Sequence, residues 1–338
     1  MKSSQEGQLF VSIIIPTYNR SNLLAKTIES FLEIDYPKQL LEIIISDNNS
    51  SDDTREVVNS FLPNETVNVR YHFEKRQGVH FARNAAAKLA KGEILYFTDD
   101  DMIADRNMLI ELIPSFGHDP KIGTATGRVL PKWEVSPAQW VLNLMSNHLL
   151  SLNDPPEEFV ISNKDCMVFS CHQAIRKEAF FDAGGYNPEN TKGLWMGDGE
   201  TGLNIKLEKL GHKFAFNGKS VIHHSIPKQR MTFSYLVKRL LNQANCDSYT
   251  EYRKSKPNAF RLILNSMERM GTALTRFLSF LICLLTMRDI WRIRIASVAY
   301  HAKRIVNDLS LAFSARRRRF TLKDDWLSDT EERKDHSL

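Results

Sequence analysis

The stretch VSIIIPTYNRSNLLAKTIESFL, residues 11–32, decides the fold of this 338-residue chain. It opens with a run of β-branched apolar residues that lacks helical spacing and ends at Pro16. A polar loop follows, after which Leu24, Ile28 and Phe31 recur at helical spacing. A continuous apolar strand, a loop and an amphipathic helix in this order are typical of one unit of a parallel α/β sheet.

The same unit recurs along the chain. We expect further strands at 41–46, 67–73 and 93–98, with helices at about 53–62 and 82–90. From about 123 to 224 the pattern is less regular, with short strands around 159–170 and 213–222 and helices near 176–183 and 200–210. Alternating strands and helices predict an α/β fold with a mostly parallel sheet covered on both faces. Ligands of such sheets bind at the carboxyl ends of the strands.

The positive charge of the chain lies in its C-terminal part. Residues 1–258 carry 30 Lys and Arg against 31 Asp and Glu, whereas residues 259–325 carry 13 against 5. Residues 326–338 carry 2 against 4. We therefore predict an α/β domain at 1–258, a basic helical extension at 259–325 and a polar tail at 326–338.

The helical extension contains apolar residues near helical spacing, which predicts two or more amphipathic helices. Its longest apolar run, 277–287, is flanked by Arg276 and Arg288 and is shorter than the roughly 20 residues that span a bilayer. Packing of these helices on the α/β domain is one interpretation. The excess of basic residues favours another, peripheral contact with an anionic membrane surface. These basic residues are Arg288, Arg292, Arg294, Lys303, Arg304 and Arg316–Arg319.

The compartment follows from the N-terminus and the cysteines. The sequence MKSSQEGQLF is polar and lacks the apolar stretch of a secretory signal. Cys166, Cys171, Cys246 and Cys283 follow no metal-ligand pattern, so we expect reduced thiols. We predict a cytoplasmic protein, peripheral at the cytoplasmic face of the membrane. Nucleic acid is not expected as a partner, because the aromatic residues of the basic region are not interleaved for base stacking.

Three consecutive carboxylates, Asp99, Asp100 and Asp101, follow the strand expected at 93–98. Adjacent carboxylates repel one another unless a positive group offsets them. Asp99 and Asp101, as alternate residues leaving a strand end, suit a hard, oxygen-preferring divalent cation. A solvated turn that caps a helix explains an isolated run of this kind about as well, but the position at a strand end favours the metal.

Polar loops after the first two strands complete the outline of a pocket. Asp47 could accept hydrogen bonds from the N–H groups of a base, and Tyr18 could stack on its face. Each loop alone is an ordinary turn, but three such loops after neighbouring strands predict one ligand pocket. The first loop consists of Pro16, Thr17, Tyr18, Asn19 and Arg20.

Later motifs add candidate catalytic groups. Asp198 and Glu200 lie in a glycine-rich turn where a helix begins, so they either cap the helix or supply a general base. Either imidazole of His223 and His224 could complete a metal shell, and a histidine pair is also commonly structural.

Taken in order, these motifs resemble the family 2 glycosyltransferases of the GT-A fold. The resemblance covers about residues 10–245 and is carried by VSIIIPTYNR, IIISDNNSSDDT, GVHFARNAAAKLAKGEILYFTDDD, FDAGGYNPE, GDGETGLNIKLEKLG and the later His-His and Arg. It implies an inverting enzyme that moves a sugar from a nucleotide-diphosphate sugar to a hydroxyl of a glycan or lipid-linked acceptor. It also implies a DXD motif that holds manganese or magnesium.

The resemblance implies roles for single residues. Pro16, Tyr18 and Asp47 would hold the base and ribose, with Arg83 near the nucleotide. Asp99 and Asp101 would be the DXD pair. Asp100 and the other residues of the first loop, Thr17, Asn19 and Arg20, would lie beside the nucleotide sugar. One of His223 and His224, with Arg230, would lie beside the diphosphate.

The identity of the base is open at this point. The family usually has Glu-Asp before the acceptor-site helix, and counting back from Gly211 its Asp falls on Glu200 and its Glu on Gly199. We favour Glu200 as the base and keep Asp198 as the alternative.

Two other functions share these residues. A metal-dependent nucleotidyltransferase would use the same pocket, but such enzymes often carry a glycine-rich phosphate loop, and PTYNRSN contains no glycine. A non-catalytic, membrane-docked nucleotide-sugar-binding protein would have to explain why the DDD and GDGE motifs are both intact. Release of free nucleoside diphosphate from a sugar donor distinguishes the glycosyltransferase from both the nucleotidyltransferase and the binding protein.

Overall fold

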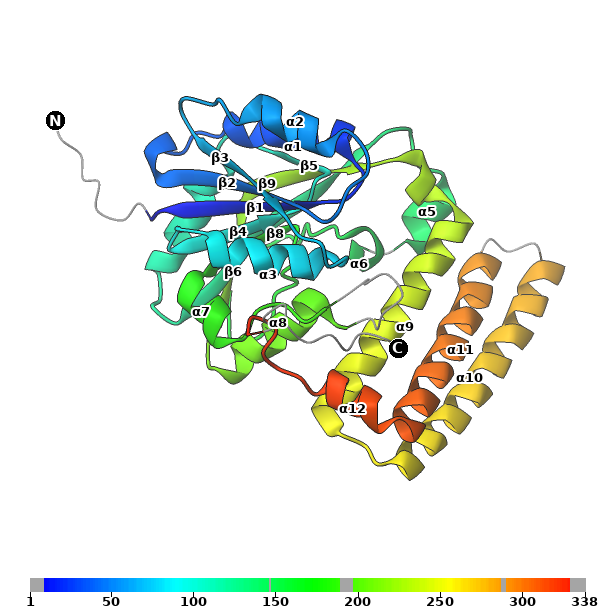
Figure 1. The fold of residues 1–338 in the computed structure, drawn as a ribbon. Coiled ribbons are helices and arrows are strands. Elements are labelled where there is room, and N and C mark those ends of the chain that lie inside the picture. The colour runs from blue at the N-terminus through cyan, green and yellow to red at the C-terminus, as the bar shows by residue number, and fades with distance from the viewer. Residues whose placement is uncertain (1–8, 146, 189–196, 287–289, 329–338) are drawn as a thin grey trace.

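Four parallel strands form one half of the β-sheet in the computed structural model, which describes residues 9–145, 147–188, 197–286 and 290–328. They lie in the order β3-β2-β1-β4 (Figure 1). Their bounds are β1 Val11–Thr17, β2 Leu41–Asp47, β3 Asn68–Phe73 and β4 Ile94–Thr98. The predicted α/β fold class is therefore confirmed for this part of the chain.

The other half of the sheet is mixed. The order continues β4-β8-β6-β9-β5, and β7 pairs with β9. The bounds are β5 Met102–Ala104, β6 Ile122–Trp133, β7 Phe159–Ser162, β8 His172–Arg176 and β9 Lys213–Ile226. Strand β8 is antiparallel to both of its neighbours, β4 and β6.

The sequence prediction was incomplete in this second half. The strand expected around 159–170 ends at Ser162, and β5, β6 and β8 were missed. Strand β6, IGTATGRVLPKW, contains two glycines, two threonines and a proline, so it lacks the continuous apolar run that identified the earlier strands. Strands β5 and β8 are too short for a periodic pattern to show.

Helices cover both faces of the sheet. On one face α1 (Ser21–Leu32) and α2 (Thr54–Phe61) pack over the core that contains Ile13 and Ile15. On the other face α3 (Val79–Leu89), α7 (Lys177–Asp182) and α8 (Gly199–Lys209) pack over the core that contains Ile14. This alternation along β1 follows from the two-residue period of a strand. The shorter helices are α4 (Met108–Leu112), α5 (Gln139–Leu144), α6 (Asn147–Leu150) and the 3₁₀ turns Lys38–Leu40, Ile113–Gly117 and Lys228–Met231.

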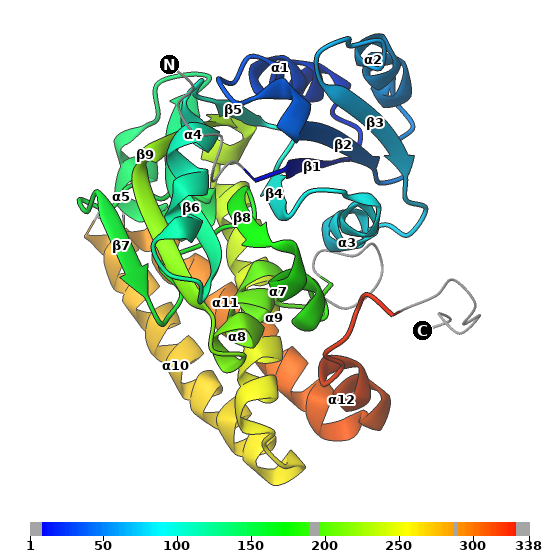
Figure 2. The ribbon, with the colours of Figure 1, turned by 90° about the vertical axis from the view of Figure 1, so that its left-hand side faces the viewer.

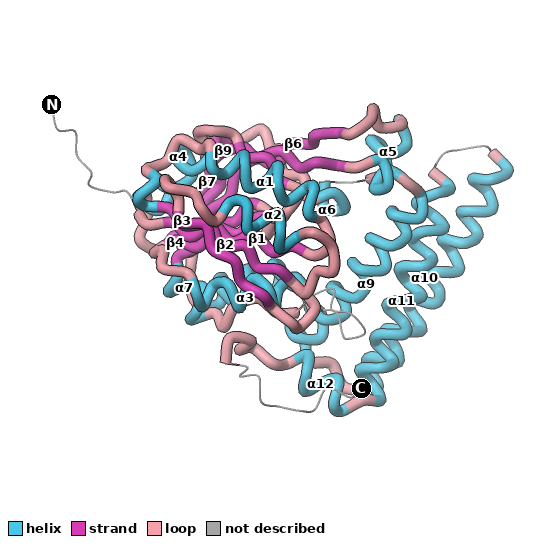
Figure 3. Tube along the Cα trace, turned by 45° about the horizontal axis from the view of Figure 1, so that its top comes forward, coloured by secondary structure: helices cyan, strands magenta, loops and turns pink. Residues whose placement is uncertain are grey.

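Three long helices lie beside the α/β part, with α11 between α9 and α10 (Figure 3). They are α9 (Phe233–Ser255), α10 (Ala259–Leu285) and α11 (Trp291–Phe313), followed by α12 (Ala315–Thr321). The predicted boundary at 258 falls in the turn between α9 and α10, so α9 already belongs to this array. Helix α9 was missed because its second half is mostly polar. Met287 and Arg288, used above to bound the apolar run, lie outside the described residues.

Within the described ranges, every helix is too short or too polar to cross a bilayer. After α12 the chain returns to the α/β part (Figure 2). Trp326 is buried there, its ring lying against Phe81 of α3 and Phe320, while Leu327 packs on the core beneath α3 and α7. Residues 329–338 of the predicted polar tail lie outside the described residues.

Candidate functional site

A cavity of about 620 Å³ opens at the carboxyl ends of β1, β2 and β4. This is the place that the polar loops predicted. The described residues that line it are Pro16, Thr17, Tyr18, Arg20, Asn48, Gln77, Gly78, Val79, Asp99 and Asp100.

The first loop is anchored at both ends. The Thr17 hydroxyl donates to Asp100 Oδ2 at 2.9 Å. Asn19 has a left-handed backbone (φ 52°), its N–H donates to Ser50 Oγ at 3.0 Å, and its Oδ1 accepts from the Ser51 N–H at 2.7 Å. These bonds hold Tyr18, which is exposed, at the mouth of the cavity. A ring in this position offers a face on which a base can stack.

The second loop presents Asn48 to the cavity. Asp47 is buried, and its oxygens accept from the Ser50 N–H at 2.9 Å and from the Tyr71 hydroxyl at 2.7 Å. Asn48 Oδ1 accepts from the Gly78 N–H at 2.7 Å, which ties this loop to the start of α3. Sequence reasoning singled out Asp47 and missed Asn48, although the two are adjacent.

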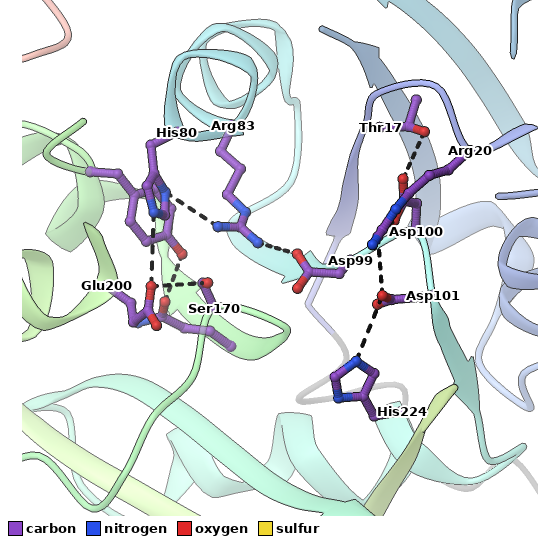
Figure 4. Close-up of polar contacts among 12 residues, drawn as sticks. Thr17, Arg20, His80, Arg83, Asp99, Asp100, Asp101, Ser170, Glu200 and His224 are labelled. Carbon is purple, nitrogen blue, oxygen red and sulfur yellow. Dashed lines mark hydrogen bonds and ion pairs between the residues drawn. The ribbon is translucent and has the colours of Figure 1, made fainter. Parts of the chain in front are cut away.

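The three carboxylates after β4 have different partners (Figure 4). Asp99 is about one-third exposed and forms an ion pair with Arg83. Asp100 is buried and pairs with Arg20 at 2.6 Å. Asp101 is buried and meets two guanidinium groups, Arg230 at 2.7 Å and Arg20 at 3.1 Å.

These partners separate the pKa values of the two buried carboxyls. Burial, opposed by Arg20, raises the pKa of Asp100 to about 6. Burial acts in the same direction on Asp101, but His224, Arg230 and Arg20 outweigh it and hold the pKa of that carboxyl well below its usual range. Asp101 is therefore the more firmly ionised member of this pair.

The two predicted histidines lie on opposite faces of β9. His224 is buried, its Nδ1 contacts Leu150 O at 2.8 Å, and its Nε2 lies 3.6 Å from Asp101 Oδ2. His223 contacts Asp105 instead, at 3.3 Å. Because neighbouring residues of a strand point to opposite faces, only one of the two can face the carboxylates. The structure brings His224 and Arg230 to the site, and does not bring His223 there.

Glu200 and Asp198 also have different surroundings. Glu200, in the first turn of α8, is partly exposed and accepts from the Ser170 hydroxyl at 3.3 Å. Asp198 is buried, and its oxygens accept from the Asn187 amide at 2.6 Å and the Thr250 hydroxyl at 2.9 Å. Burial raises the pKa of Asp198. Of the two predicted bases, Glu200 is therefore the one that solvent and a substrate can reach.

His80 and Arg83 of α3 connect Glu200 to Asp99 (Figure 4). Arg83 pairs with Asp99 and also lies 3.2 Å from His80 Nδ1, while His80 Nε2 lies 3.8 Å from Glu200 Oε2. Burial, together with the charge of Arg83, lowers the pKa of His80 to about 3, so this imidazole is neutral. Since a guanidinium only donates, Nδ1 accepts and the ring proton lies on Nε2, facing Glu200.

His80 was missed by the sequence reasoning, although it lies in the quoted string GVHFARN. Ser170 was missed as well, because no motif contains it. Tyr186, within the quoted FDAGGYNPE, stacks on His80 with ring centroids 4.6 Å apart and so fixes the imidazole.

The donor set fits a hard divalent cation that shares its shell with a diphosphate. Asp99 lines the cavity, whereas Asp101 is buried and paired with Arg20 and Arg230. As the predicted ligands, both would supply carboxylate oxygens, and magnesium-type ions are typically held by one or two carboxylates plus substrate phosphates and water. Within the described ranges, no three His, Cys, Asp or Glu side chains gather into a group that could hold a metal by itself. Bound phosphate oxygens would therefore have to complete the shell.

The model of the family described as Glycosyl transferase family 2 matches residues 12–182, about half of the chain. The chain belongs to glycosyl transferase family 2. The matched region contains β1 to β4, the cavity and the three carboxylates.

Curated relatives agree with this assignment. The chain is 41% identical over 93 residues to a GalNAc(5)-diNAcBac-PP-undecaprenol beta-1,3-glucosyltransferase of Campylobacter jejuni, which covers 27% of this chain and 29% of the relative. The chain thus spans under a third of the length of that relative. It is 23% identical over 249 residues to a glucosyl-dolichyl phosphate glucuronosyltransferase of Haloferax volcanii, covering 68% of this chain and 73% of the relative.

A solved structure confirms the GT-A type of fold for this family 2 chain. The mannosyltransferase PcManGT from Pyrobaculum calidifontis, in complex with GDP-Man and Mn2+, superposes with a TM-score of 0.60 at 18% identity. The match covers 89% of this chain and 87% of the other, so it extends into the helical array.

Proposed function

We propose that this chain is an inverting glycosyltransferase that moves a sugar from a nucleotide-diphosphate sugar to a hydroxyl of a lipid-linked or glycan acceptor. One observation carries the proposal. Asp99, on the donor side of the cavity, and Glu200, at the start of α8, reach the same His80–Arg83 pair from opposite sides. A donor diphosphate at Asp99 and an acceptor hydroxyl at Glu200 would then meet between them.

The donor is held in this proposal by the first two loops and by the cationic side chains. Tyr18 stacks on the base, and Asn48, whose amide ties the second loop to Glu74, Arg76 and Gly78, forms part of the cavity wall. Arg20 and Arg230, which already pair with Asp101, lie beside the diphosphate. A divalent cation at Asp99 and Asp101 would neutralise the charge that develops on the departing diphosphate.

The transfer is a direct displacement. Glu200 takes the proton of the acceptor hydroxyl while its oxygen forms a bond to the anomeric carbon. The bond from that carbon to the diphosphate oxygen breaks, and the nucleoside diphosphate leaves with the electron pair. Neutral His80, whose Nε2 proton faces Glu200, keeps that carboxylate oriented without adding a charge of its own.

The acceptor class is proposed from two relatives whose names specify undecaprenol and dolichyl phosphate carriers. We propose that the acceptor here is also lipid-linked, which would place the chain at the cytoplasmic face of a membrane.

The test is a screen of nucleotide sugars with the full chain, Mn2+ and lipid-linked or glycan acceptors, in which release of nucleoside diphosphate is measured. Glu200→Gln should lower turnover by about 10²–10⁴-fold and leave donor affinity unchanged, because a general base acts on the acceptor. Asp198→Asn is the comparison variant, because this buried carboxyl does not face the acceptor and its loss should lower turnover only several-fold.

Three results would overturn parts of the proposal. If Asp198→Asn abolishes transfer and Glu200→Gln does not, the base is Asp198. Pyrophosphate in place of nucleoside diphosphate would identify a nucleotidyltransferase. Tight donor binding without turnover, on any lipid-linked or glycan acceptor, would identify a binding protein.

A further inference from the structure

The outer helix α10 presents an apolar face that no other described part of the chain covers. Ten large apolar residues of α10 are exposed, with exposed fractions from 40% at Phe277 to 85% at Leu285. Most of them recur three or four positions apart, which places them on one side of the helix. They are Phe260, Met267, Met270, Leu274, Phe277, Leu278, Leu281, Ile282, Leu284 and Leu285, which we call the α10 face.

The inward side of α10 carries the polar contacts. Arg269 pairs with Asp308 of α11 at 2.8 Å and with Glu251 of α9 at 2.9 Å. Asp308 is buried, as is Arg304, which also pairs with Glu251. A helix that only packed on its neighbours in water would turn its apolar side inward and its charges outward. Helix α10 instead leaves large apolar residues exposed and turns Arg269 toward α9 and α11, with Leu262 and Cys283 also buried.

The α10 face extends along almost the whole of the helix. It runs from Phe260 to Leu285, which at 1.5 Å per residue is about 39 Å of helix. Apolar patches on soluble monomers rarely exceed a few hundred Å², and larger ones mark a partner or a membrane. Helix α10 packs along α11 on its other side. The α10 face is therefore already formed and can bind a partner without refolding.

Two features indicate a lipid surface as the occupant. Residues 259–325 carry a net charge of +8, which attracts anionic headgroups. At the end of the array Trp291 lies against Phe280, with ring centroids 6.3 Å apart, and Arg292 stacks over both Trp291 and Trp140 at 4.8 and 5.1 Å. Tryptophan and long basic side chains of this kind are concentrated at membrane–water interfaces.

We propose that the α10 face lies in the plane of an anionic bilayer, with its apolar side chains inserted at headgroup level. Strand β1 runs toward the side of the molecule that carries the helical array (Figure 1), so docking by α10 brings the carboxyl ends of the strands toward the membrane. This consequence rests on the proposed function, because it matters only if the acceptor is lipid-linked. The docking itself needs neither donor nor acceptor.

The test is co-sedimentation of the full chain with vesicles at low salt, using phosphatidylcholine mixed with phosphatidylglycerol and phosphatidylcholine alone. Wild type should bind the anionic vesicles and lose binding as salt rises. Leu274→Glu combined with Leu281→Glu should weaken binding at least tenfold, because two charges would enter the headgroup region. The control pair is Ile110→Glu with Leu210→Glu, at 45% and 52% exposure on other surfaces, which should bind like wild type.

Three other binding results would overturn the docking proposal. If the α10 variant and wild type bind vesicles equally, the α10 face is not the surface that contacts the membrane. If wild type does not bind vesicles, a membrane is not the partner of this face. A wild-type dimer in sedimentation equilibrium that the α10 variant abolishes would assign the face to a second copy. Nucleoside diphosphate release, measured without vesicles, should be the same in all variants, so vesicle binding without any sugar turnover would refute the proposed function and leave the docking intact.

Discussion

Thr250 of α9 donates a hydrogen bond to Asp198 Oδ2 at 2.9 Å and thereby joins the helical array to the residue that precedes α8. Asn187 donates to the other carboxylate oxygen at 2.6 Å. A Cβ atom at Gly202 would lie 2.0 Å from Asp198 Oδ1, so glycine is required where α8 passes this carboxylate. Asp198 thus fixes the start of the helix that carries Glu200, and we infer that it is a positioning residue.

The first prediction follows from that contact. Thr250→Val removes the hydroxyl donor and leaves a buried carboxylate oxygen without it, so the free energy of unfolding should fall by about 1–3 kcal/mol. The kcat for sugar transfer should fall several-fold as Glu200 loses its orientation, while the KM for the donor stays constant. Thr250→Ser should restore both values. A purely structural role would lower stability in Thr250→Val with no change in kcat, which would contradict the inference.

The second prediction concerns the metal. Asp99→Asn is the better probe, because its amide oxygen can still accept from Arg83, whereas Asp101 is shared by Arg20 and Arg230. Asp99→Asn should raise the Mn2+ concentration for half-maximal activity by at least tenfold, and excess chelator should abolish turnover in wild type. Asp105→Asn is the matched control, since that carboxylate contacts His223 on the other face of β9. Full activity of wild type in chelator would exclude the metal.

The third prediction concerns pH. Burial lowers the pKa of His172 to about 4, against about 6.5 in an unfolded chain. Between these values the unfolded chain binds a proton that the folded chain does not, so stability is fully present above pH 6.5 and falls as the pH drops toward 4. His172 alone should account for about 3 kcal/mol of that loss.

Urea unfolding at pH 7.5 and pH 5 measures this effect. His172→Gln should be less stable than wild type at pH 7.5, because the imidazole contacts Tyr96 at 2.7 Å, but it should lose less stability on acidification. His118→Gln, at an exposed site, should lose as much free energy of unfolding between pH 7.5 and pH 5 as wild type does. If His172→Gln loses as much free energy of unfolding between pH 7.5 and pH 5 as wild type, the His172 imidazole is not the group that causes the loss.

The sequence predicted where the site lies better than what each side chain does there. The carboxyl ends of parallel strands lie at one edge of the sheet. The order of strands and helices along the chain was therefore enough to predict that the loops at Pro16, Asp47 and Asp99 lie close together. The separate partners of Asp99, Asp100 and Asp101 depend on Arg20, Arg83 and Arg230, which are contacts between distant parts of the chain. No local pattern contains that information.

Two further features depend on tertiary packing: which histidine faces Asp101, and which side of α10 faces inward. The period of a strand requires His223 and His224 to point apart, but the register of β9 against β5 and β6 decides which one meets Asp101. The sequence of α10 also predicts an amphipathic helix, but its spacing cannot tell whether the apolar side faces inward. The ion pairs of Arg269 decide this, and they join three helices.

The last prediction concerns the chain end, where sequence reasoning expected only a polar tail. Trp326 is buried, with its ring centroid 5.1 Å from that of Phe320 and 6.4 Å from that of Phe81. Its backbone N–H donates to Gly184 O at 3.0 Å, and Gly184 has a left-handed backbone (φ 71°). A Cβ atom at Gly184 would lie 2.9 Å from Asp324 O, so glycine lets the returning chain come close.

Trp326→Ala should therefore lower the free energy of unfolding by about 3 kcal/mol, the lower end of the range for deleting a buried aromatic ring. Phe313→Ala, at an exposed site on α11, should cost less than about 0.5 kcal/mol. Because Phe81 follows His80 in α3, loss of the Trp326 ring should also lower kcat, with the Mn2+ requirement unchanged. Urea unfolding and steady-state kinetics measure the two effects, and a Trp326→Ala chain as stable as Phe313→Ala would show that the Trp326 ring contributes nothing to the fold.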